Sequence, residues 1–328
     1  MYTRRKILSY GLGVTLASVL SPGISLGQAP TAKTPMKMVV AYPPGGSVDI
    51  TARLLSAPME AKLGRTVIID NRPGASGTIG ASQVIRAEPD GSTIILASSI
   101  EIAIQPVFNP SPSYNPSKDL KPIAMVGKLP YILVVRDDSP IKSLDDLVKF
   151  GKDNPGKLNF ASYGNFSSPH LIGELLNMTT GIKATHVPYK GSSPAVVDLL
   201  GGQVDFMFDT AVATLPQINS GRMRALATTA ATTLPMASEI PTMSNLGYPD
   251  LTFEGWIGFF APSATPEPTL SSLREMSGDL LSQPEIKETL LSRFVIPSVQ
   301  MSEAQLIKFL KQETHRFESL VAHIKIAE

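Results

Sequence analysis

The same local pattern occurs twice in this chain, first as Met38-Val39-Val40-Ala41-Tyr42-Pro43-Pro44-Gly45-Gly46-Ser47 and again as Phe160-Ala161-Ser162-Tyr163-Gly164-Asn165-Phe166-Ser167-Ser168-Pro169. In each stretch a short apolar strand is followed by a turn of Gly, Ser and Pro and then by the start of a helix. A helix start carries unpaired backbone N–H groups and about half a positive charge. Two such starts facing one cleft can hold a carboxylate without Lys or Arg. The pattern therefore predicts a binding site for a small organic anion.

Strands and helices alternate along the rest of the chain, which favours parallel sheets covered by helices and hence an α/β fold. Most strand candidates are short, apolar and β-branched, as expected for strands that are covered on both faces. With 328 residues and 43% hydrophobic content, two domains are expected. The predicted strands are 38–42, 67–70, 93–97, 132–135, 158–161, 184–188, 204–208 and 224–228.

Several helices have recognisable ends. Ser168 is the predicted cap of a helix over 169–180, which Gly181 terminates, and a second helix runs from Ser193 to Gly201. The C-terminal helix begins with the capping box Ser302-x-x-Gln305. In the first helix, over 48–63, Pro58 removes a backbone hydrogen bond, so a kink or a break is expected near Ala57.

The N-terminus has the layout of a secretory signal peptide over residues 1–29. Arg4, Arg5 and Lys6 precede an apolar run from Ile7 to Leu20, and small residues follow. Gly and Pro interrupt this run, which is shorter than the ~20 apolar residues of a membrane span. The Arg pair also fits a twin-arginine export motif, and the choice between the two export routes stays open. The chain contains no Cys, and therefore no lipid-modified Cys, so a soluble, exported, periplasmic protein is expected.

Charge and motif content exclude several classes of function. The 29 basic and 28 acidic residues nearly cancel and aromatic content is 6%, so nucleic acid is not an expected partner. Nucleophile-elbow, zinc-protease and P-loop motifs are absent from the sequence, and His170 and His186 are interpreted as structural residues. We predict no catalytic residue, no metal and no cofactor. A hydrolase acting through Ser167 or Ser168 is the enzymatic alternative.

Several motifs together resemble the Bug receptors of tripartite tricarboxylate transporters, the TctC-like family. The first is Tyr42-Pro43-Pro44-Gly45-Gly46-Ser47-x-Asp49 with Ala52-Arg53. In the same order follow the segments 71–80, 89–91, 164–175, 186–191 and 198–205. The resemblance covers nearly all of the chain after the signal peptide.

This resemblance implies a two-lobed periplasmic binding protein of type II with a ligand cleft between the lobes. The chain is expected to cross between lobes at two hinges, near 127–131 and near 253–257. One lobe would then comprise residues 33–127 plus 254–328, and the other residues 128–253. In such receptors, the two turns quoted above grip a carboxylate, partly through ordered water.

The candidate ligand-binding residues follow from the turns and from the resemblance. Gly45 and Gly46 allow close backbone approach, and Ser47, Ser167 and Ser168 add hydroxyl donors, although each Ser also suits a simple helix cap. Asp49 would repel an anion and is expected to pair with Arg53. The full predicted set is Tyr42, Gly45, Gly46, Ser47, Gly74, Ala75, Ser76, Ser98, Ser99, Tyr163, Gly164, Asn165, Phe166, Ser167, Ser168 and Asp209.

Ligand identity stays open at this point. Asp209 is expected opposite the gripped carboxylate, where it could contact an amine, a hydroxyl or a protonated acid. Tyr163 and Phe166 replace small residues of the family pattern. If they line the pocket, they suit an aromatic ligand; if they do not, both rings pack in the core of the lobe. Expected ligands are di- or tricarboxylates, acidic amino acids and aromatic carboxylates.

Two outputs are compatible with this reading. A monomeric receptor would deliver its ligand to the integral membrane subunits of a tripartite transporter. Alternatively, an orphan receptor would report the solute to a periplasmic sensor domain. Nothing in the sequence separates transport from sensing.

Overall fold

A computed structural model describes residues 34–111 and 114–321. The predicted signal peptide, residues 1–29, lies outside this described part of the chain. Within it, no helix is long and apolar enough to span a lipid bilayer.

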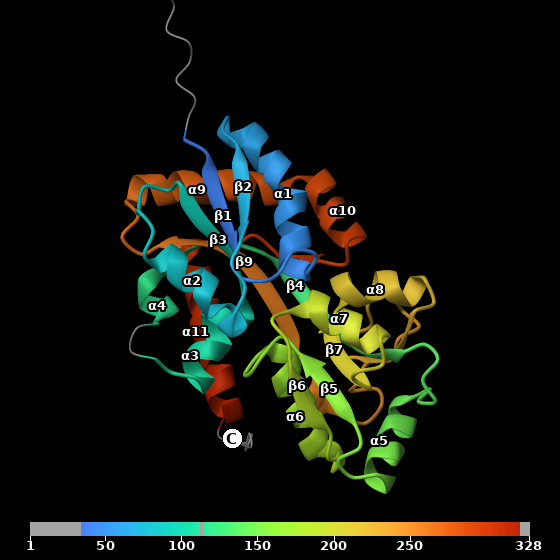
Figure 1. Cartoon of the computed structure of the whole chain (residues 1–328). Helices are drawn as coiled ribbons and strands as arrows, with labels where there is room; N and C mark the ends of the chain where they lie inside the picture. The colour runs from blue at the N-terminus through green and yellow to red at the C-terminus, as the bar shows by residue number, and fades with distance from the viewer. Residues whose placement is uncertain (1–33, 112–113, 322–328) are drawn as a thin grey trace, which may run out of the picture. The chain divides into compact units, whose positions relative to one another are not determined.

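The described strands form one mixed sheet in the order β2-β1-β3-β9-β4-β7-β5-β6, with β8 and β10 also paired to β4 (Figure 1). All eight predicted strands are confirmed, with shifts of one or two residues at most of their ends. The bounds are β1 (Met36–Val40), β2 (Val67–Asn71), β3 (Thr93–Ser98), β4 (Leu120–Arg136), β5 (Asn159–Ser162), β6 (Thr185–Pro188), β7 (Phe206–Thr210), β8 (Met223–Thr228), β9 (Glu254–Pro262) and β10 (Ile296–Pro297).

Parallel pairing prevails at both ends of the sheet, whereas the centre is antiparallel. Strand β1 is parallel to β2 and β3, and β5 is parallel to β6 and β7. Between these groups, β9 pairs antiparallel with both β3 and β4, and β4 pairs antiparallel with β7 and β8. Strand β9 and the first half of β4 were not predicted as strands, and only the hinge crossings near 127–131 and 253–257 were placed within them.

Strand β4 joins the two groups. It pairs with β9 from Leu120 to Pro130 and with β7 from Tyr131 to Val135. Strand β9 begins at Glu254. The change of partner between Pro130 and Tyr131 and the start of β9 at Glu254 both fall inside the segments where we predicted hinge crossings. The division into lobes stays a prediction.

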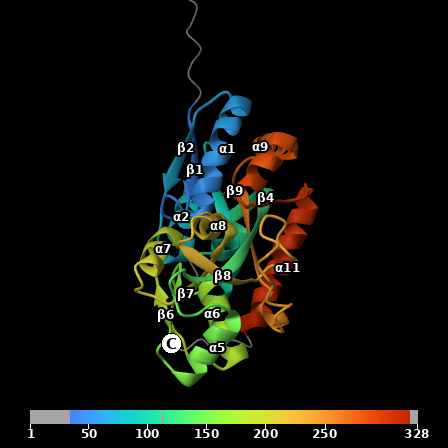
Figure 2. The same ribbon diagram turned by 90° about the vertical axis from the view of Figure 1, so that its right-hand side faces the viewer.

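Helices cover the sheet on both sides. In Figure 2, α9 and α11 lie on one side of β4 and β9, and α2 and α7 lie on the other. The helix bounds are α1 (Ser47–Leu63), α2 (Thr78–Ile85), α3 (Gln105–Phe108), α4 (Pro116–Asp119), α5 (Leu144–Asp153), α6 (Ser168–Thr180), α7 (Ser192–Leu200), α8 (Ala211–Asn219), α9 (Glu267–Ser282), α10 (Pro284–Ser292) and α11 (Glu303–Val321), with short turns η1 (Ala75–Gly77), η2 (Ile100–Ile104) and η3 (Pro249–Leu251).

Helix ends agree with the sequence analysis except at two places. Helix α1 continues through Pro58, so the chain does not break near Ala57, and the alternative of a kink there stays a prediction. Helix α6 is capped by Ser167 rather than Ser168, and the Ser167 side chain makes no capping hydrogen bond. The capping box of α11 is confirmed by reciprocal hydrogen bonds between Ser302 and Gln305.

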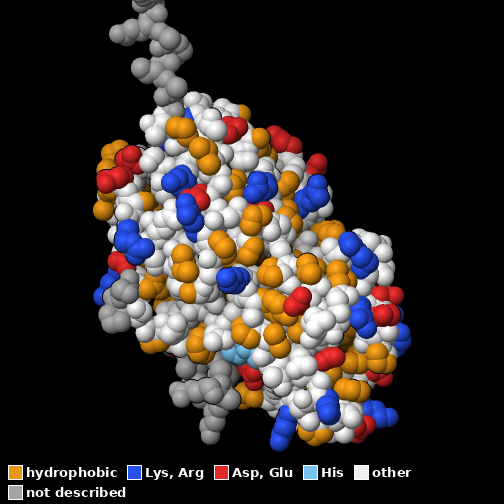
Figure 3. Space-filling model, in the orientation of Figure 1, with side chains coloured by type: hydrophobic (Ala, Val, Ile, Leu, Met, Phe, Trp, Pro, Cys, Tyr) orange, Lys and Arg blue, Asp and Glu red, His pale blue; other side chains and the backbone are white. Residues whose placement is uncertain are grey.

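One continuous hydrophobic core runs through both groups of strands. Its largest fully buried side chains include Phe160, Phe206, Phe208, Phe259 and Phe317. On the face drawn in Figure 3, basic and acidic side chains are interspersed rather than gathered into one patch.

Candidate functional site

The first turn joins β1 to α1 and brings backbone N–H groups into the centre of the molecule. Gly45 has φ +81°, a conformation that favours glycine, and Gly46 is the N-cap of α1. Asp49 accepts hydrogen bonds from Arg53 and from the backbone N–H of Gly45. The predicted Asp49–Arg53 pair is thus confirmed. The Gly45 N–H donates to the Asp49 carboxylate and is therefore already hydrogen-bonded. Burial alone would raise the pKa of Asp49, but the bonds from Arg53 and Gly45 outweigh burial and lower it.

The second turn joins β5 to α6 and is held by local hydrogen bonds. Gly164 has φ +118° and Phe166 has φ +58°. The Ser162 hydroxyl accepts from the Gly164 N–H, and His170 Nδ1 accepts from the Phe166 N–H. The Oγ atom of Ser167 is buried and has no hydrogen-bond partner among the described residues.

Two histidines support this turn as neutral structural groups. The rings of His170 and His186 stack at a centroid distance of 3.8 Å, and His186 Nε2 lies 2.6 Å from Ser162 Oγ. Burial lowers the pKa of His170 to about 4 and, together with His170, that of His186 to about 3. In the described part of the chain, no cluster of three or more His, Asp or Glu side chains could hold a metal ion.

A buried acid that the sequence analysis missed organises the end of β3. Glu101 is fully buried and accepts hydrogen bonds from the Tyr42 hydroxyl at 2.7 Å, the Ser98 hydroxyl at 2.6 Å and the Ser98 N–H at 2.7 Å. Burial raises the pKa of this carboxyl group, against these hydrogen bonds. A lone acid inside the apolar run Ile100-Glu101-Ile102-Ala103-Ile104 was the available signal.

A second buried acid, Asp209, ends β7. Its carboxylate accepts from the hydroxyls of Tyr163 and Ser192, the latter at 2.6 Å, and from the Thr210 N–H at 2.6 Å. The hydroxyls of Thr210 and Ser47 are also hydrogen-bonded to each other, which connects α8 to α1. Burial raises the pKa of Asp209 to about 6, despite the hydrogen bonds from Ser192 and Tyr163.

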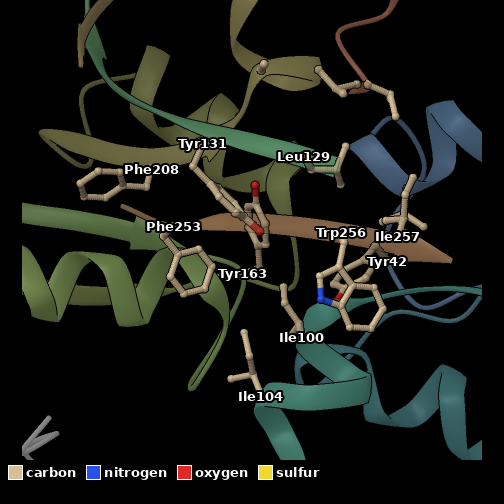
Figure 4. Packing of buried hydrophobic residues seen from close by; sticks show 14 of the residues in the cluster. Tyr42, Ile100, Ile104, Leu129, Tyr131, Tyr163, Phe208, Phe253, Trp256 and Ile257 are labelled. Atoms are coloured by element: carbon tan, nitrogen blue, oxygen red, sulfur yellow. The ribbon is translucent and has the colours of Figure 1, made fainter. Parts of the chain in front are cut away.

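A central cavity of about 30 Å³ lies between these two acids and their hydroxyl partners. Five predicted site residues line it: Tyr42, Gly46, Ser47, Ser98 and Tyr163. The sequence analysis did not select the other lining residues, Val48, Ile100, Leu129, Tyr131, Ser192, Thr210 and Trp256. Figure 4 shows Tyr131 and Tyr163 next to each other beside β9, with Trp256 and Tyr42 close together to one side.

Two of these missed residues had a usable signal. Gly191-Ser192-Ser193-Pro194 repeats the Gly/Ser/Pro turn before a helix, and Thr210 immediately precedes α8. By contrast, Leu129, Tyr131 and Trp256 sit on the central strands β4 and β9, and their position at the cavity depends on strand pairing.

A wider surface hollow of about 480 Å³ lies next to the cavity and shares Tyr163 with it. Its lining includes the predicted residues Ala75, Ser76, Gly164, Asn165 and Phe166. Ala75 and Ser76 have positive φ angles of 47° and 48°, which are uncommon for residues other than glycine. Tyr163 lines the cavity, whereas Phe166 lines the hollow and stacks on Phe108.

The remaining six predicted residues line neither the cavity nor this hollow: Gly45, Gly74, Ser99, Ser167, Ser168 and Asp209. The Ser168 hydroxyl, like that of Ser167, is buried and has no hydrogen-bond partner among the described residues. No Lys or Arg is among the residues lining the central cavity.

Hydrogen bonds span the two strand groups around the hollow. Ser76 Oγ donates to the Asn165 carbonyl at 2.8 Å, and Gln105 Nε2 donates to the carbonyls of Asn165 and Phe166 at 2.9 and 3.2 Å. Close to the first turn, Ser193 Oγ donates to the Pro44 carbonyl at 2.9 Å. The two strand groups are therefore in contact at the hollow and next to the first turn.

Comparison with known proteins identifies relatives over nearly the whole chain. The family described as tripartite tricarboxylate transporter family receptor matches residues 51–326. Protein BugT of Bordetella pertussis strain Tohama I is 34% identical over 322 residues, which cover 98% of this chain and 98% of BugT.

Solved structures of similar proteins agree with this assignment. The periplasmic binding protein BugD is 33% identical with a TM-score of 0.84, covering 88% of this chain and 97% of BugD. MatC from Rhodopseudomonas palustris with bound malate is 30% identical with a TM-score of 0.83, covering 88% of this chain and 99% of MatC. Rpa4515 of R. palustris with adipate is 30% identical with a TM-score of 0.85, covering 90% of this chain and 99% of that protein.

These likenesses confirm the α/β fold of a two-lobed periplasmic binding protein. The matched family consists of receptors, so the prediction of a binding protein rather than an enzyme is also confirmed. The chain belongs to the tripartite tricarboxylate transporter receptors, a family of periplasmic solute-binding proteins.

Proposed function

We propose that this protein captures a small organic carboxylate between two lobes, residues 33–127 plus 254–328 and residues 128–253, and delivers it to the membrane subunits of a tripartite transporter. One observation carries the proposal: the starts of α1, α7 and α8 converge on one cavity through Ser47, Ser192 and Thr210. Similar proteins bound to malate and adipate support a carboxylate as the ligand.

The anion is held, in this proposal, by helix starts rather than by a cation. The N–H groups of Ser47 and Val48 lie in the first turn of α1 at the cavity wall, where the helix dipole favours negative charge. The start of α6 acts as the second grip. The hydroxyls of Ser167 and Ser168 are both buried and have no hydrogen-bond partner among the described residues, so both are available to a ligand that displaces the turn.

The cavity is small, since only about 30 Å³ of it is open to the centres of water molecules. An organic acid of several heavy atoms needs more room, so we infer that the lobes open at β4 and β9 to admit it. The contacts of Ser76, Gln105 and Ser193 across the strand groups would then belong to the closed state. We propose that the bound carboxylate stabilises this closed state through contacts with both lobes.

The protein is proposed to act as an exported, soluble monomer in the periplasm, without a lipid anchor. The signal-peptide layout of residues 1–29 and the absence of Cys from the sequence support this location. Transport and sensing are distinguished in a deletion strain. Loss of uptake supports delivery to a transporter, whereas intact uptake with lost gene induction supports a sensor partner.

Thermal unfolding tests carboxylate binding directly. The mature protein is denatured and refolded to remove bound ligand and then melted with aliphatic dicarboxylates, citrate, acidic amino acids and aromatic carboxylates. A ligand at 100 times its Kd stabilises the folded state by about 2.7 kcal/mol, which raises Tm by several degrees. If no acid in this panel raises Tm, the protein is not a carboxylate receptor.

Substitutions in the two turns test the grip. A Cβ placed on Gly46 would lie 3.9 Å from Ser192 Cβ. The larger side chain of Gly46→Val would therefore occupy space that a ligand needs to reach the start of α1. We expect at least a tenfold loss of affinity from Gly46→Val and a smaller loss from the double change Ser167→Ala and Ser168→Ala. Ser220→Ala is the control, because Ser220 lies at the surface and its hydroxyl bonds only to its near neighbours, the Gln217 carbonyl and Arg222 Nε. Unchanged affinity in both turn variants would refute the assignment of these turns.

A further inference from the structure

Four hydroxyl groups around the central cavity donate their hydrogens to buried carboxylates: those of Tyr42, Ser98, Tyr163 and Ser192. A hydroxyl has a single hydrogen, so a hydroxyl that donates to a carboxylate presents only lone pairs elsewhere. Tyr42 and Ser98 both donate to Glu101, at 2.7 and 2.6 Å. On this wall of the cavity, the two hydroxyl oxygens are therefore hydrogen-bond acceptors.

The opposite wall has the same arrangement around Asp209. Tyr163 and Ser192 both donate their hydroxyl hydrogens to this carboxylate. The indole N–H of Trp256, a further lining residue, donates to Glu313 of α11 at 2.9 Å. These side chains thus offer acceptors, or no donor, to a ligand in the cavity.

Donors are concentrated at one end of the cavity, at the start of α1. The N–H groups of Ser47 and Val48 are free of backbone acceptors at a helix start. Ser47 and Thr210 share one hydrogen bond, which leaves at most one of their two hydroxyl hydrogens for a ligand. The cavity thus has a donor end that suits a carboxylate and acceptor walls that suit hydrogen-bond donors.

We propose that Glu101 and Asp209 determine ligand specificity by fixing these hydroxyl orientations. The site then prefers a carboxylate that carries a hydroxyl or ammonium group at its other end to a carboxylate that carries a second ionised carboxylate there. This inference rests on the proposed carboxylate-receptor function and refines its ligand class. Both side chains act on the ligand through their hydroxyl partners, since neither lines the cavity.

Electrostatics points in the same direction. Glu101 and Asp209 are both fully buried, and all of their hydrogen-bond donors in the structure are neutral. With no Lys or Arg in the cavity lining, a second ionised carboxylate next to these acids would be repelled. A neutral hydroxyl avoids this repulsion, and an ammonium group is attracted.

Protonation of Asp209 provides an internal check. A protonated carboxyl group donates a hydrogen bond, which frees one hydroxyl hydrogen of Tyr163 or Ser192 for the ligand. The groups packed against Asp209 are Tyr163 and Tyr131 among titratable residues, with Ser192 and Thr210 as polar neighbours. Because the pKa of Asp209 is raised to about 6, this change falls in an accessible pH range.

The test compares ligands of equal length that differ only in the distal group. Affinities for adipate, 6-hydroxyhexanoate, 6-aminohexanoate and hexanoate, and for succinate, 4-hydroxybutyrate, 4-aminobutyrate and butyrate, are measured by calorimetry at pH 7.5. We expect the hydroxy or amino acid to bind at least tenfold more tightly than the dicarboxylate of the same length. The two arms distinguish a hydroxyl from an ammonium group as the selected donor.

Asp209→Asn and Glu101→Gln keep the shape of each side chain and remove its charge. Each is expected to lower the preference over the dicarboxylate by at least fivefold, and Asp209→Asn also removes any change in preference between pH 8 and pH 6. Asp205→Asn is the matched control, because its carboxylate accepts the Asn159 N–H at 2.7 Å and does not line the cavity. If Glu101→Gln does not fold, Asp209→Asn and the pH series of the wild type decide the question.

The outcomes separate the two proposals. If dicarboxylates bind as well as or better than their hydroxy and amino counterparts, the specificity role is overturned while carboxylate capture stands. The specificity role is also overturned if Asp209→Asn and Glu101→Gln both keep the wild-type preference for the hydroxy or amino acid over the dicarboxylate. If none of the acids binds, both proposals fail.

Discussion

At the scale of single residues, the buried acids around the cavity are the unusual feature of this protein. A buried carboxylate is normally paired with a cation, because desolvation disfavours its charge. Glu101 and Asp209 are fully buried and are instead hydrogen-bonded by neutral hydroxyl and N–H groups. Their ionisation therefore opposes folding, and the pKa of each carboxyl group is raised.

The first prediction concerns the pH dependence that Asp209 gives to stability. Its folded-state pKa of about 6 exceeds the ordinary 3.8. The contribution of Asp209 to the free energy of unfolding is therefore fully present below about pH 4 and is lost as pH rises through 6. Between pH 5 and 7.5, Asp209→Asn should therefore gain about 1 kcal/mol in free energy of unfolding relative to the wild type.

Urea unfolding of the ligand-free protein at each pH measures this difference. Asp205→Asn serves as the control, since Asp205 precedes β7 and is only partly buried. A constant difference between the wild type and Asp209→Asn from pH 5 to pH 7.5 would show that Asp209 is ionised normally.

At the scale of elements, the second turn depends on how closely α6 packs on β5. Gly173 lies in the middle of α6, and a Cβ placed on it would be 2.2 Å from Phe160 Cε2. Phe160 is fully buried in β5, where its ring stacks on Phe206 and is tilted against His186. The ring therefore has no free space into which it could move, and the glycine sets the distance between helix and strand.

Gly173→Ala is predicted to destabilise the protein by about 2 kcal/mol. Alanine favours a helix by about 1 kcal/mol over glycine, but overpacking a tight core costs about 1–3 kcal/mol or more. We expect a Tm lower by several degrees in calorimetry. The control is Gly201→Ala at the end of α7, where the nearest atom to the added Cβ is 3.4 Å away and φ is negative. A Gly173→Ala protein as stable as the wild type would mean that α6 packs less tightly than described.

At the scale of the whole molecule, the two strand groups are connected by continuous strands and by side-chain contacts. Strands β4 and β9 run through the centre, where β4 exchanges one partner for another at Tyr131. Away from these strands, the contacts of Ser76 and Gln105 with the β5–α6 turn span the groups. If the lobes move as proposed, these contacts form only on closure and contribute to affinity without touching the ligand.

The double change Ser76→Ala and Gln105→Ala tests this coupling. The two side chains donate three hydrogen bonds to the turn. Each contributes about 1 kcal/mol net, so their loss should weaken ligand affinity roughly 100-fold. Calorimetry measures the affinity, and small-angle scattering should show a larger radius of gyration at subsaturating ligand. Ser220→Ala again serves as the control. Full affinity in the double variant would exclude a role of these contacts in closure.

The sequence alone determined the local structure of this protein. Alternating apolar runs and turns predicted the strands of both parallel groups, and local residue chemistry predicted the Asp49–Arg53 pair and the α11 capping box. Each of these features involves residues at most four positions apart, except for the strands, which follow from apolar content. Short-range patterns of this kind depend on backbone geometry and can be recognised in a single sequence.

The tertiary structure decided which residues surround the cavity. Glu101 lies 59 positions from Tyr42, and Asp209 lies 46 positions from Tyr163, yet these pairs set the polarity of the walls. Tyr131 and Trp256 reach the cavity because β4 and β9 pair at the centre of the sheet. Hydrogen bonds between such distant residues depend on strand order and burial. They leave no periodic trace in the sequence, so the helix starts were predictable and the acids behind the hydroxyl groups were not.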